Sequence, residues 1–110
     1  MNTRTPEYIK GSGACIVSRR VMDGTGRLKW MTRAVPSNLA DTGWRFLADT
    51  DDEDFINDPA NMLIRDYNAV AEVEPAIIPI YSMGVGSDLQ LIVRDGKRSI
   101  VDNRTGLPIA

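Results

Sequence analysis

Short runs in which apolar residues alternate with polar ones are the main pattern in the first third of the chain. Residues 14–18 have the composition of a β-strand, and residues 27–33 alternate charged and apolar side chains. On a strand, that alternation would place Leu28 and Trp30 on one face and Met31 on the other. Because an Asp-Gly-Thr-Gly turn signal separates the two runs, we predict a β-hairpin here.

The middle third carries signals for two more strands and a helix. Residues 43–48 have the pattern of a short strand that places its Trp and Phe on one face, where such rings usually join a core. Residues 62–64 form a second apolar run. Asp66 is then a suitable N-cap, and apolar residues at helical spacing follow it until Pro75, which must end the helix.

The last third predicts a second β-hairpin. Residues 89–94 and 98–102 are rich in strand formers, and the Asp-Gly pair between them is the strongest hairpin signal in the chain. Upstream, residues 77–81 are predicted to be extended, with Pro79 excluded from a central ladder position. The Gly-Val-Gly at 84–86 lacks the further residues of a phosphate-binding loop, so we predict a mobile connector.

Together these elements predict an α+β fold: a small, twisted, mainly antiparallel sheet with one or two short helices packed on one face. A small closed barrel is the alternative. The chain has 110 residues, and we expect residues 1–110 to form a single domain. Within it, residues 1–12 are predicted to be a flexible arm, and residues 82–110 a C-terminal hairpin and tail.

Histidine is absent from the sequence, which removes the commonest general acid–base, the usual zinc ligand and every Ser-His or Cys-His pair. The one cysteine, Cys15, lies in an apolar run typical of a core. A single cysteine allows no internal disulfide, which fits a reducing cytoplasm.

No apolar run has the length of a transmembrane helix, and residues 1–10 lack the apolar region of a signal peptide. We expect a cytoplasmic protein with no recognisable set of catalytic residues and no membrane partner, while carboxylate-only catalysis and carboxylate-bound Mg²⁺ or Ca²⁺ remain open.

Charge is distributed unevenly, although the net charge is only −2. Residues 1–48 contain eight Lys and Arg against three Asp and Glu, whereas residues 49–75 contain one Arg against nine acids. The basic residues alternate with apolar ones, as on a solvated sheet face, and no nucleic-acid-binding motif accompanies them. We therefore expect no nucleic-acid partner.

The densest acidic run, residues 49–54, has the alternating carboxylates of a calcium loop but not its register. The sixth position is Asp54 where that loop needs Gly, and the twelfth is Ala60 where it needs Glu. Two interpretations remain open. The run is either a solvated acidic loop or a surface that meets a basic partner and speeds their association.

The order of segments over residues 14–81 resembles a bacterial immunity-protein family of polymorphic toxin systems, immunity protein family thirty-three, formerly catalogued as a domain of unknown function. Its most specific stretch is the Asp-x-Gly-Trp-Arg-Phe block at 41–46, followed by acids and by Asn-Asp-Pro-x-Asn at 57–61. The resemblance implies an α+β cytoplasmic protein that binds and neutralises a cognate toxin, without a cofactor and without catalysis. It does not extend beyond Tyr81.

From the residues and the resemblance together we predict a partner-binding surface, with aromatic and Arg anchors at its centre and acids at its rim. Asp41, beside this set, can cap a turn or pair with Arg45. Two alternatives stay open: a carboxylate-based, metal-dependent hydrolase around residues 49–58, and a general protein-interaction or regulatory domain. The predicted binding residues are Trp44, Arg45, Asp49, Asp51, Asp52, Glu53, Asp54, Phe55 and Asp58.

Overall fold

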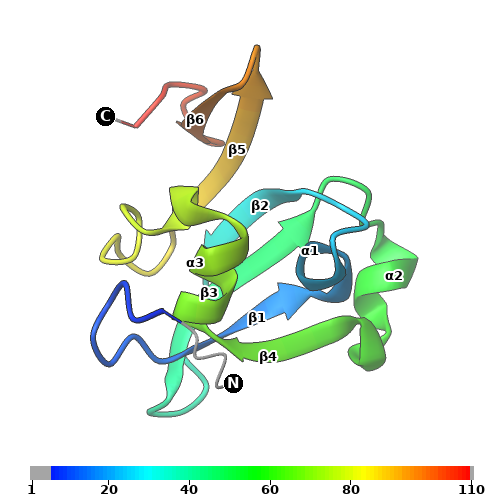
Figure 1. Cartoon of the computed structure of the whole chain (residues 1–110), viewed down its shortest axis with the longest axis vertical. Helices are drawn as coiled ribbons and strands as arrows, with labels where there is room; N and C mark the ends of the chain where they lie inside the picture. Colours follow the sequence, from blue (N-terminus) through cyan, green and yellow to red (C-terminus); the bar gives the residue numbers. More distant parts are fainter. Residues whose placement is uncertain (1–5, 110) are drawn as a thin grey trace.

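Six β-strands form one open sheet in the order β4-β1-β3-β2-β5-β6, and short helices cover one of its faces (Figure 1). The computed structural model describes residues 6–109. β1 and β3 run parallel, and the other four neighbouring pairs are antiparallel. The predicted α+β fold is therefore confirmed, and the closed-barrel alternative is wrong. In chain order the elements are β1 (Ala14–Ser18), α1 (Arg19–Asp23), β2 (Leu28–Arg33), β3 (Asp41–Ala48), α2 (Glu53–Asn57), η1 (Pro59–Asn61), β4 (Met62–Asp66), α3 (Tyr67–Val73), η2 (Pro75–Ile77), β5 (Asp88–Arg94) and β6 (Lys97–Asp102).

The hairpin predicted from residues 14–18 and 27–33 is wrong, because helix α1 separates the two strands. The Ser18 side chain accepts a hydrogen bond from the backbone N–H of Arg20 and caps this helix. Gly24 ends it with a φ of 81°. The glycine that suggested a hairpin turn is thus a left-handed helix cap. β1 pairs instead with β3 on one side and β4 on the other.

β2 contains an irregularity that changes which of its side chains share a face. The register between β2 and β3 shifts between Leu28 and Trp30. Since such a shift restarts the alternation of side chains, Leu28 and Met31 are both buried, while Trp30 is 37% exposed. The prediction that placed Leu28 and Trp30 on one face is therefore wrong.

β3 supplies the centre of the core, as its alternation predicts. Trp44 and Phe46 are both fully buried, and their rings stack with centroids 5.9 Å apart. Tyr67, the first residue of α3, meets the Phe46 ring edge-on at 5.7 Å. Val70 and Ala71 on the next turn are also buried. This packing lays α3 on the sheet beside α1 (Figure 1).

Helix α3 begins and ends where the sequence predicts. The Asp66 side chain accepts a hydrogen bond from the backbone N–H of Asn68, as an N-cap does. The helix ends at Val73, ahead of Pro75. Both boundaries follow from residues within one or two positions of them.

The segment 77–81 is not extended, so that prediction is wrong. Pro75 begins the 3-10 helix η2, and turns continue from it through residue 82. With a repeat near three residues per turn, Ile77 and Ile80 point the same way, and both are buried. The apolar run therefore closes one end of the core.

β5 and β6 form the hairpin that the Asp-Gly pair predicts. Asp95 and Gly96 have positive φ angles of 51° and 75°, as a tight two-residue turn requires. β5 pairs with β2 over only part of its length, so the tip of the hairpin projects from the sheet (Figure 1). Along the outer side of β6, the backbone N–H of Ile109 donates to the Ile100 carbonyl. The tail thereby covers that edge of the sheet.

Part of the predicted arm contacts the body of the protein, while residues 1–5 lie outside the described residues. The Asn68 side chain exchanges two hydrogen bonds with the backbone of Ile9. The Tyr81 hydroxyl donates to the Ser12 carbonyl. These bonds attach the end of the arm to α3 and to the segment after η2.

Gly43, in the family-like block, occupies a position that excludes a side chain. Its φ is 89°, and a Cβ built on it would lie 2.1 Å from the Ala34 carbonyl oxygen. We therefore predict that Gly43→Ala lowers the free energy of unfolding by about 2–4 kcal/mol. Gly84→Ala is the matched control, because its Cβ would meet nothing within 4 Å. It should change stability by less than about 0.5 kcal/mol. Urea unfolding followed by circular dichroism measures both, and equal effects would contradict this account.

Candidate functional site

The acidic segment 49–58 is helical in its second half, where residues Glu53–Asn57 form α2, while residues 49–52 form a turn and irregular backbone. The Asp52 side chain accepts a hydrogen bond from the Phe55 N–H at 2.8 Å and caps α2. Asp58 does the same for η1 through the Ala60 N–H at 3.0 Å. Carboxylates at helix N-termini are stabilised by the unpaired N–H groups there, so this acidic sequence favours these turns locally.

Asp51 is held inside the structure. Its side chain is 1% exposed, and one oxygen accepts a hydrogen bond from the Ala48 N–H at 2.7 Å. The other oxygen lies 3.5 Å from the Arg20 guanidinium. This carboxylate ties the acidic segment to the end of β3 and to α1. As a correction to the predicted set, the Asp51 carboxylate is buried and does not face solvent as the rim of a binding surface would.

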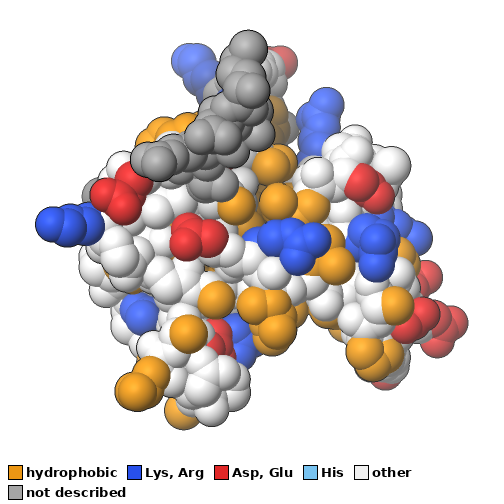
Figure 2. Space-filling model, turned by 60° about the horizontal axis from the view of Figure 1, so that its bottom comes forward, with side chains coloured by type: hydrophobic (Ala, Val, Ile, Leu, Met, Phe, Trp, Pro, Cys, Tyr) orange, Lys and Arg blue, Asp and Glu red, His pale blue; other side chains and the backbone are white. Residues whose placement is uncertain are grey.

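Five other carboxylates of the segment are exposed, and we call them the acidic corner: Asp49, Asp52, Glu53, Asp54 and Asp58. Figure 2 shows acidic side chains gathered on the side of the molecule where α2 lies. Among the described residues, the carboxylates of Glu53 and Asp54 have no hydrogen-bond or ion-pair partner. Their charge is therefore available to attract a basic surface.

Two arginines of α1 contact residues within and next to the acidic segment. The Arg20 guanidinium carbon lies 3.7 Å from the centroid of the half-buried Phe55 ring, and this is a close cation–π contact. Arg19 donates a hydrogen bond to the Ala60 carbonyl. Some of the basic charge of the N-terminal half is thus used inside the molecule to fix the acidic segment.

Trp44 lies in the core and not at the surface. Its exposed fraction is 0%, and its Nε1 donates to the Tyr81 carbonyl at 3.1 Å. With no surface of its own, Trp44 cannot contact a partner in this conformation, so its predicted role as an anchor needs correction. Its sequence neighbour Arg45 lies on the opposite, open face of the sheet because strand side chains alternate.

Arg45 forms a bidentate ion pair with Asp41 on that open face. Nη1 and Nη2 donate to Oδ1 and Oδ2 at 2.9 and 2.8 Å. Asp41 also accepts hydrogen bonds from the backbone N–H groups of Ser37 and Gly43, which confirms both roles predicted for it. The Arg45 guanidinium, helped by these N–H groups, holds the pKa of Asp41 well below its usual range. The carboxylate in turn raises the pKa of Arg45.

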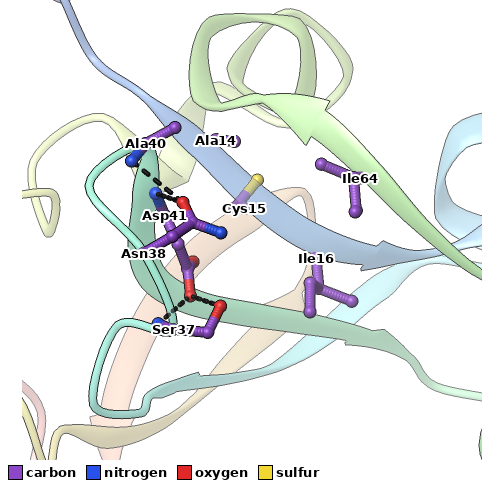
Figure 3. Close-up of a pocket in the computed structure, with 8 residues that line it drawn as sticks. All are labelled: Ala14, Cys15, Ile16, Ser37, Asn38, Ala40, Asp41 and Ile64. Atoms are coloured by element: carbon purple, nitrogen blue, oxygen red, sulfur yellow. Dashed lines mark hydrogen bonds between the residues drawn. The ribbon is translucent and has the colours of Figure 1, made fainter.

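A shallow pocket of about 130 Å³ lies beside this ion pair (Figure 3). Ile16 of β1 and Ile64 of β4 line one side, and Asn38 and Asp41 lie opposite them on the segment that leads into β3. Cys15 also lines it, but burial raises the pKa of its thiol to about 12. The thiol is therefore protonated at neutral pH. The pocket chiefly offers apolar contact.

Two larger grooves, of about 530 and 550 Å³, open where β5 separates from β2. Arg27, Leu28, Leu91 and Val93 line both grooves. Of the predicted binding residues, Asp49 alone lines either of them. They are open depressions created by the projecting hairpin.

The alternating carboxylates that suggested a metal site do not converge. Asp49 and Asp51 accept hydrogen bonds from the backbone N–H groups of Arg27 and Ala48, and the Glu53 carboxylate has no partner among the described residues. Within residues 6–109, no group of three or more His, Cys, Asp or Glu side chains is arranged to hold a metal ion. Over the same residues, no helix combines the length and the apolar character needed to cross a membrane.

Ile64 is the clearest surface feature that the sequence analysis missed. It is 70% exposed in the middle of β4, and its register partner on β1 is Ile16. The apolar run at 62–64 predicts a strand but not its place in the sheet. The charged residues that follow, Arg65 and Asp66, are the sequence signal that indicates an edge strand, because charges on a short strand are typical of a sheet edge.

Comparison with known proteins provides one match. A family model described as Immunity protein Imm33 domain matches residues 15–102. The match continues past Tyr81 to the end of the β5–β6 hairpin, so the predicted limit of the resemblance is wrong. No curated protein and no solved structure matches the chain significantly.

The Asp41–Arg45 pair makes the stability of the protein depend on pH. Asp41 has a lower pKa in the folded state than its ordinary value of 3.8, so its ionised form stabilises the fold above that pH. We predict that Asp41→Asn lowers the free energy of unfolding by about 1–3 kcal/mol at pH 7. The difference from the parent should shrink as the pH falls below 3.8. Urea titrations at several pH values measure it, with Glu72→Gln as an exposed control. A difference that stays constant with pH would be inconsistent with this assignment.

Proposed function

The chain belongs to the Imm33 immunity-protein family, and from this membership we propose that it binds and neutralises a cognate bacterial toxin protein. We infer that it acts by occupying a surface of the toxin, without catalysis, in the cytoplasm of the cell that makes it. The acidic corner is the observation that supports a location for the toxin-binding surface on the molecule.

The acidic corner has the properties of a preorganised electrostatic surface. Its five carboxylates project from one short stretch of chain, and neighbouring carboxylates attract an approaching cation together. Asp52 and Asp58 are held in place as helix caps. Arg19 binds the Ala60 carbonyl and Arg20 contacts the Phe55 ring, and these contacts stabilise the segment further. Because the segment is already ordered, a partner does not have to order it on binding.

A basic surface is the natural complement of the acidic corner. Proteins that cleave or modify nucleic acids carry Lys and Arg where they contact phosphates. An acidic protein that covers such residues would both associate quickly with the toxin and block access to its substrate. We therefore propose a toxin that acts on nucleic acid as the partner class.

The proposed surface differs from the predicted set in two residues. Trp44 and Asp51 are buried and are removed from it. Phe55 stays as the half-buried inner margin of the acidic corner. Arg45 lies on β3 three residues before the strand ends at Ala48, roughly 10 Å from that end at about 3.3 Å per residue, and its contact with a partner stays a prediction.

Protection of cells tests the immunity role directly. The probe is the product of the gene adjacent to this chain's gene, expressed from an inducible promoter. Cells should survive its induction only when the chain is co-expressed, and the two proteins should co-purify. A toxin from an unrelated system is the control and should kill in either case. Death of the co-expressing cells would overturn the proposal, and survival without co-purification would overturn the binding mechanism.

Charge reversal tests the acidic corner itself. Glu53→Lys combined with Asp54→Lys changes two exposed acids that cap nothing. We predict about tenfold slower association with the inactivated toxin domain at low salt, and a flatter salt dependence.

The control for this reversal is Glu7→Lys combined with Glu72→Lys, which alters net charge equally at exposed sites outside the acidic corner. Surface plasmon resonance at several salt concentrations compares the two double variants. If both slow association equally, net charge alone matters, and the acidic corner is not the binding surface.

A further inference from the structure

The two edges of the sheet differ in whether they are covered. At the β6 edge, the backbone N–H of Asp102 donates to the Leu107 carbonyl and that of Ile109 donates to the Ile100 carbonyl. The tail thus occupies that edge. β4 forms the opposite edge, and among residues 6–109 no segment pairs with its outer side.

The register shows which backbone groups of β4 point outward. Tyr67 donates its N–H to the Gly13 carbonyl, and the same antiparallel register places Arg65 opposite Cys15 and Leu63 opposite Val17. Hydrogen-bonded pairs alternate with non-bonded pairs along an antiparallel ladder. The groups of Leu63 and Arg65 therefore face β1, and those of Met62, Ile64 and Asp66 face away from the sheet.

Ile64 presents the central donor of this open edge. The N–H of Met62 is already used, because it donates to the Pro59 carbonyl at the end of η1. The Ile64 carbonyl accepts a hydrogen bond from Nη1 of Arg65 at 2.8 Å. The exposed Arg65 side chain thus covers the outward-facing Ile64 carbonyl. An unpaired edge of this kind is a ready template for another strand.

An apolar contact lies directly beside the open edge. Ile64 and Ile16 lie next to each other on β4 and β1 and form one wall of the 130 Å³ pocket (Figure 3). Figure 2, in which the bottom of Figure 1 is turned forward, shows hydrophobic side chains interleaved with Lys and Arg on the part of the surface that faces the viewer. A strand added to β4 would place alternate side chains over Ile64, where an apolar one could reach the pocket.

The acidic corner leads directly into the open edge. Asp58 caps η1, and η1 ends where β4 begins. In Figure 1, α2 lies at the starting end of β4. A segment laid along β4 would therefore run toward the acidic corner at one end. Lys or Arg residues at that end would meet Asp58, Glu53 and Asp54.

From these observations we propose that the toxin partner docks by adding an extended, basic segment as a strand to the outer edge of β4. Backbone hydrogen bonds centred on Ile64 give the attachment, the Ile16–Ile64 wall receives an apolar side chain, and the acidic corner receives Lys or Arg. The inference rests on the proposed function and specifies how the partner is held. A second copy of this chain would bring its own acidic corner rather than an excess of basic residues, so charge favours the toxin segment.

Amide hydrogen exchange measured by NMR tests the docking on the unmodified chain. In the free protein the outward N–H of Ile64 should exchange much faster than the N–H groups of Leu63 and Arg65. On addition of an inactivated form of the protein against which the chain protects cells, exchange of the Ile64 amide should slow by at least about tenfold. If a complex forms and the Ile64 amide exchanges as before, the strand-addition proposal is wrong and the proposed function stands.

Two substitutions at one position provide a second test. Ile64→Pro removes the outward N–H, and proline is tolerated on an edge strand whose N–H faces solvent. It should weaken binding of the toxin domain about tenfold, while circular dichroism shows an unchanged fold. Ile64→Val keeps the N–H and the apolar contact, and it should bind as the parent does. Equal affinities of the two variants would overturn the proposal, and the exchange experiment decides the matter if the proline variant does not fold.

The same measurements distinguish the toxin segment from a second copy of this chain as the strand that pairs with β4. Protection of the Ile64 amide in the chain alone, rising with its concentration, would show that a second copy pairs with β4 and would overturn the choice of partner. No binding of the toxin domain by any form of the chain would instead contradict the proposed function.

Discussion

Four aromatic rings packed in a row, Trp44, Phe46, Tyr67 and Tyr81, join the sheet to everything that covers it. Successive ring centroids lie 5.9, 5.7 and 4.8 Å apart. Their polar atoms bond to backbone in the irregular parts of the chain: Trp44 to Tyr81, Tyr67 to Ile77, and Tyr81 to Ser12. A buried polar group must find such a partner, so the rings also fix the course of these segments. Helix α3, η2 and the end of the arm are all attached to β3 in this way.

This inward packing decides what β3 presents on its other face. With Trp44 and Phe46 buried, Arg45 must point outward, where Asp41 holds it through two hydrogen bonds. The strand then continues to Ala48, whose N–H is bonded by Asp51. The acidic segment therefore starts from a fixed point at the edge of the core, and its orientation depends on the aromatic row.

The acidic corner and the open edge of β4 belong to one continuous stretch of chain. α2, η1 and β4 follow one another with no long connection, and β4 pairs along its inner side with β1. Charge and an unpaired backbone edge thus occur side by side on one surface. These features serve different parts of recognition, because exposed charge mainly sets the rate of encounter whereas backbone pairing and apolar contact set how long a complex lasts.

The sequence by itself determined the features that depend on neighbouring residues. The cap at Asp66, the end of α3 before Pro75, the turn at Asp95-Gly96 and the alternation of β3 each follow from local backbone and side-chain preferences. The order of segments also carried the resemblance to the immunity family that the family model confirms.

Tertiary structure alone decided which strands pair and which faces are covered. β1 lies between β3 and β4, neither of which follows it directly in the chain. A register shift reverses the faces of Trp30 and Met31, and Arg20 and the Ala48 N–H draw Asp51 inward. Ile64 is 70% exposed on the edge strand β4, and the apolar run at 62–64 does not by itself reveal that place in the sheet. Periodicity reports a side chain's direction relative to its own strand, whereas burial depends on which distant segment packs against that strand.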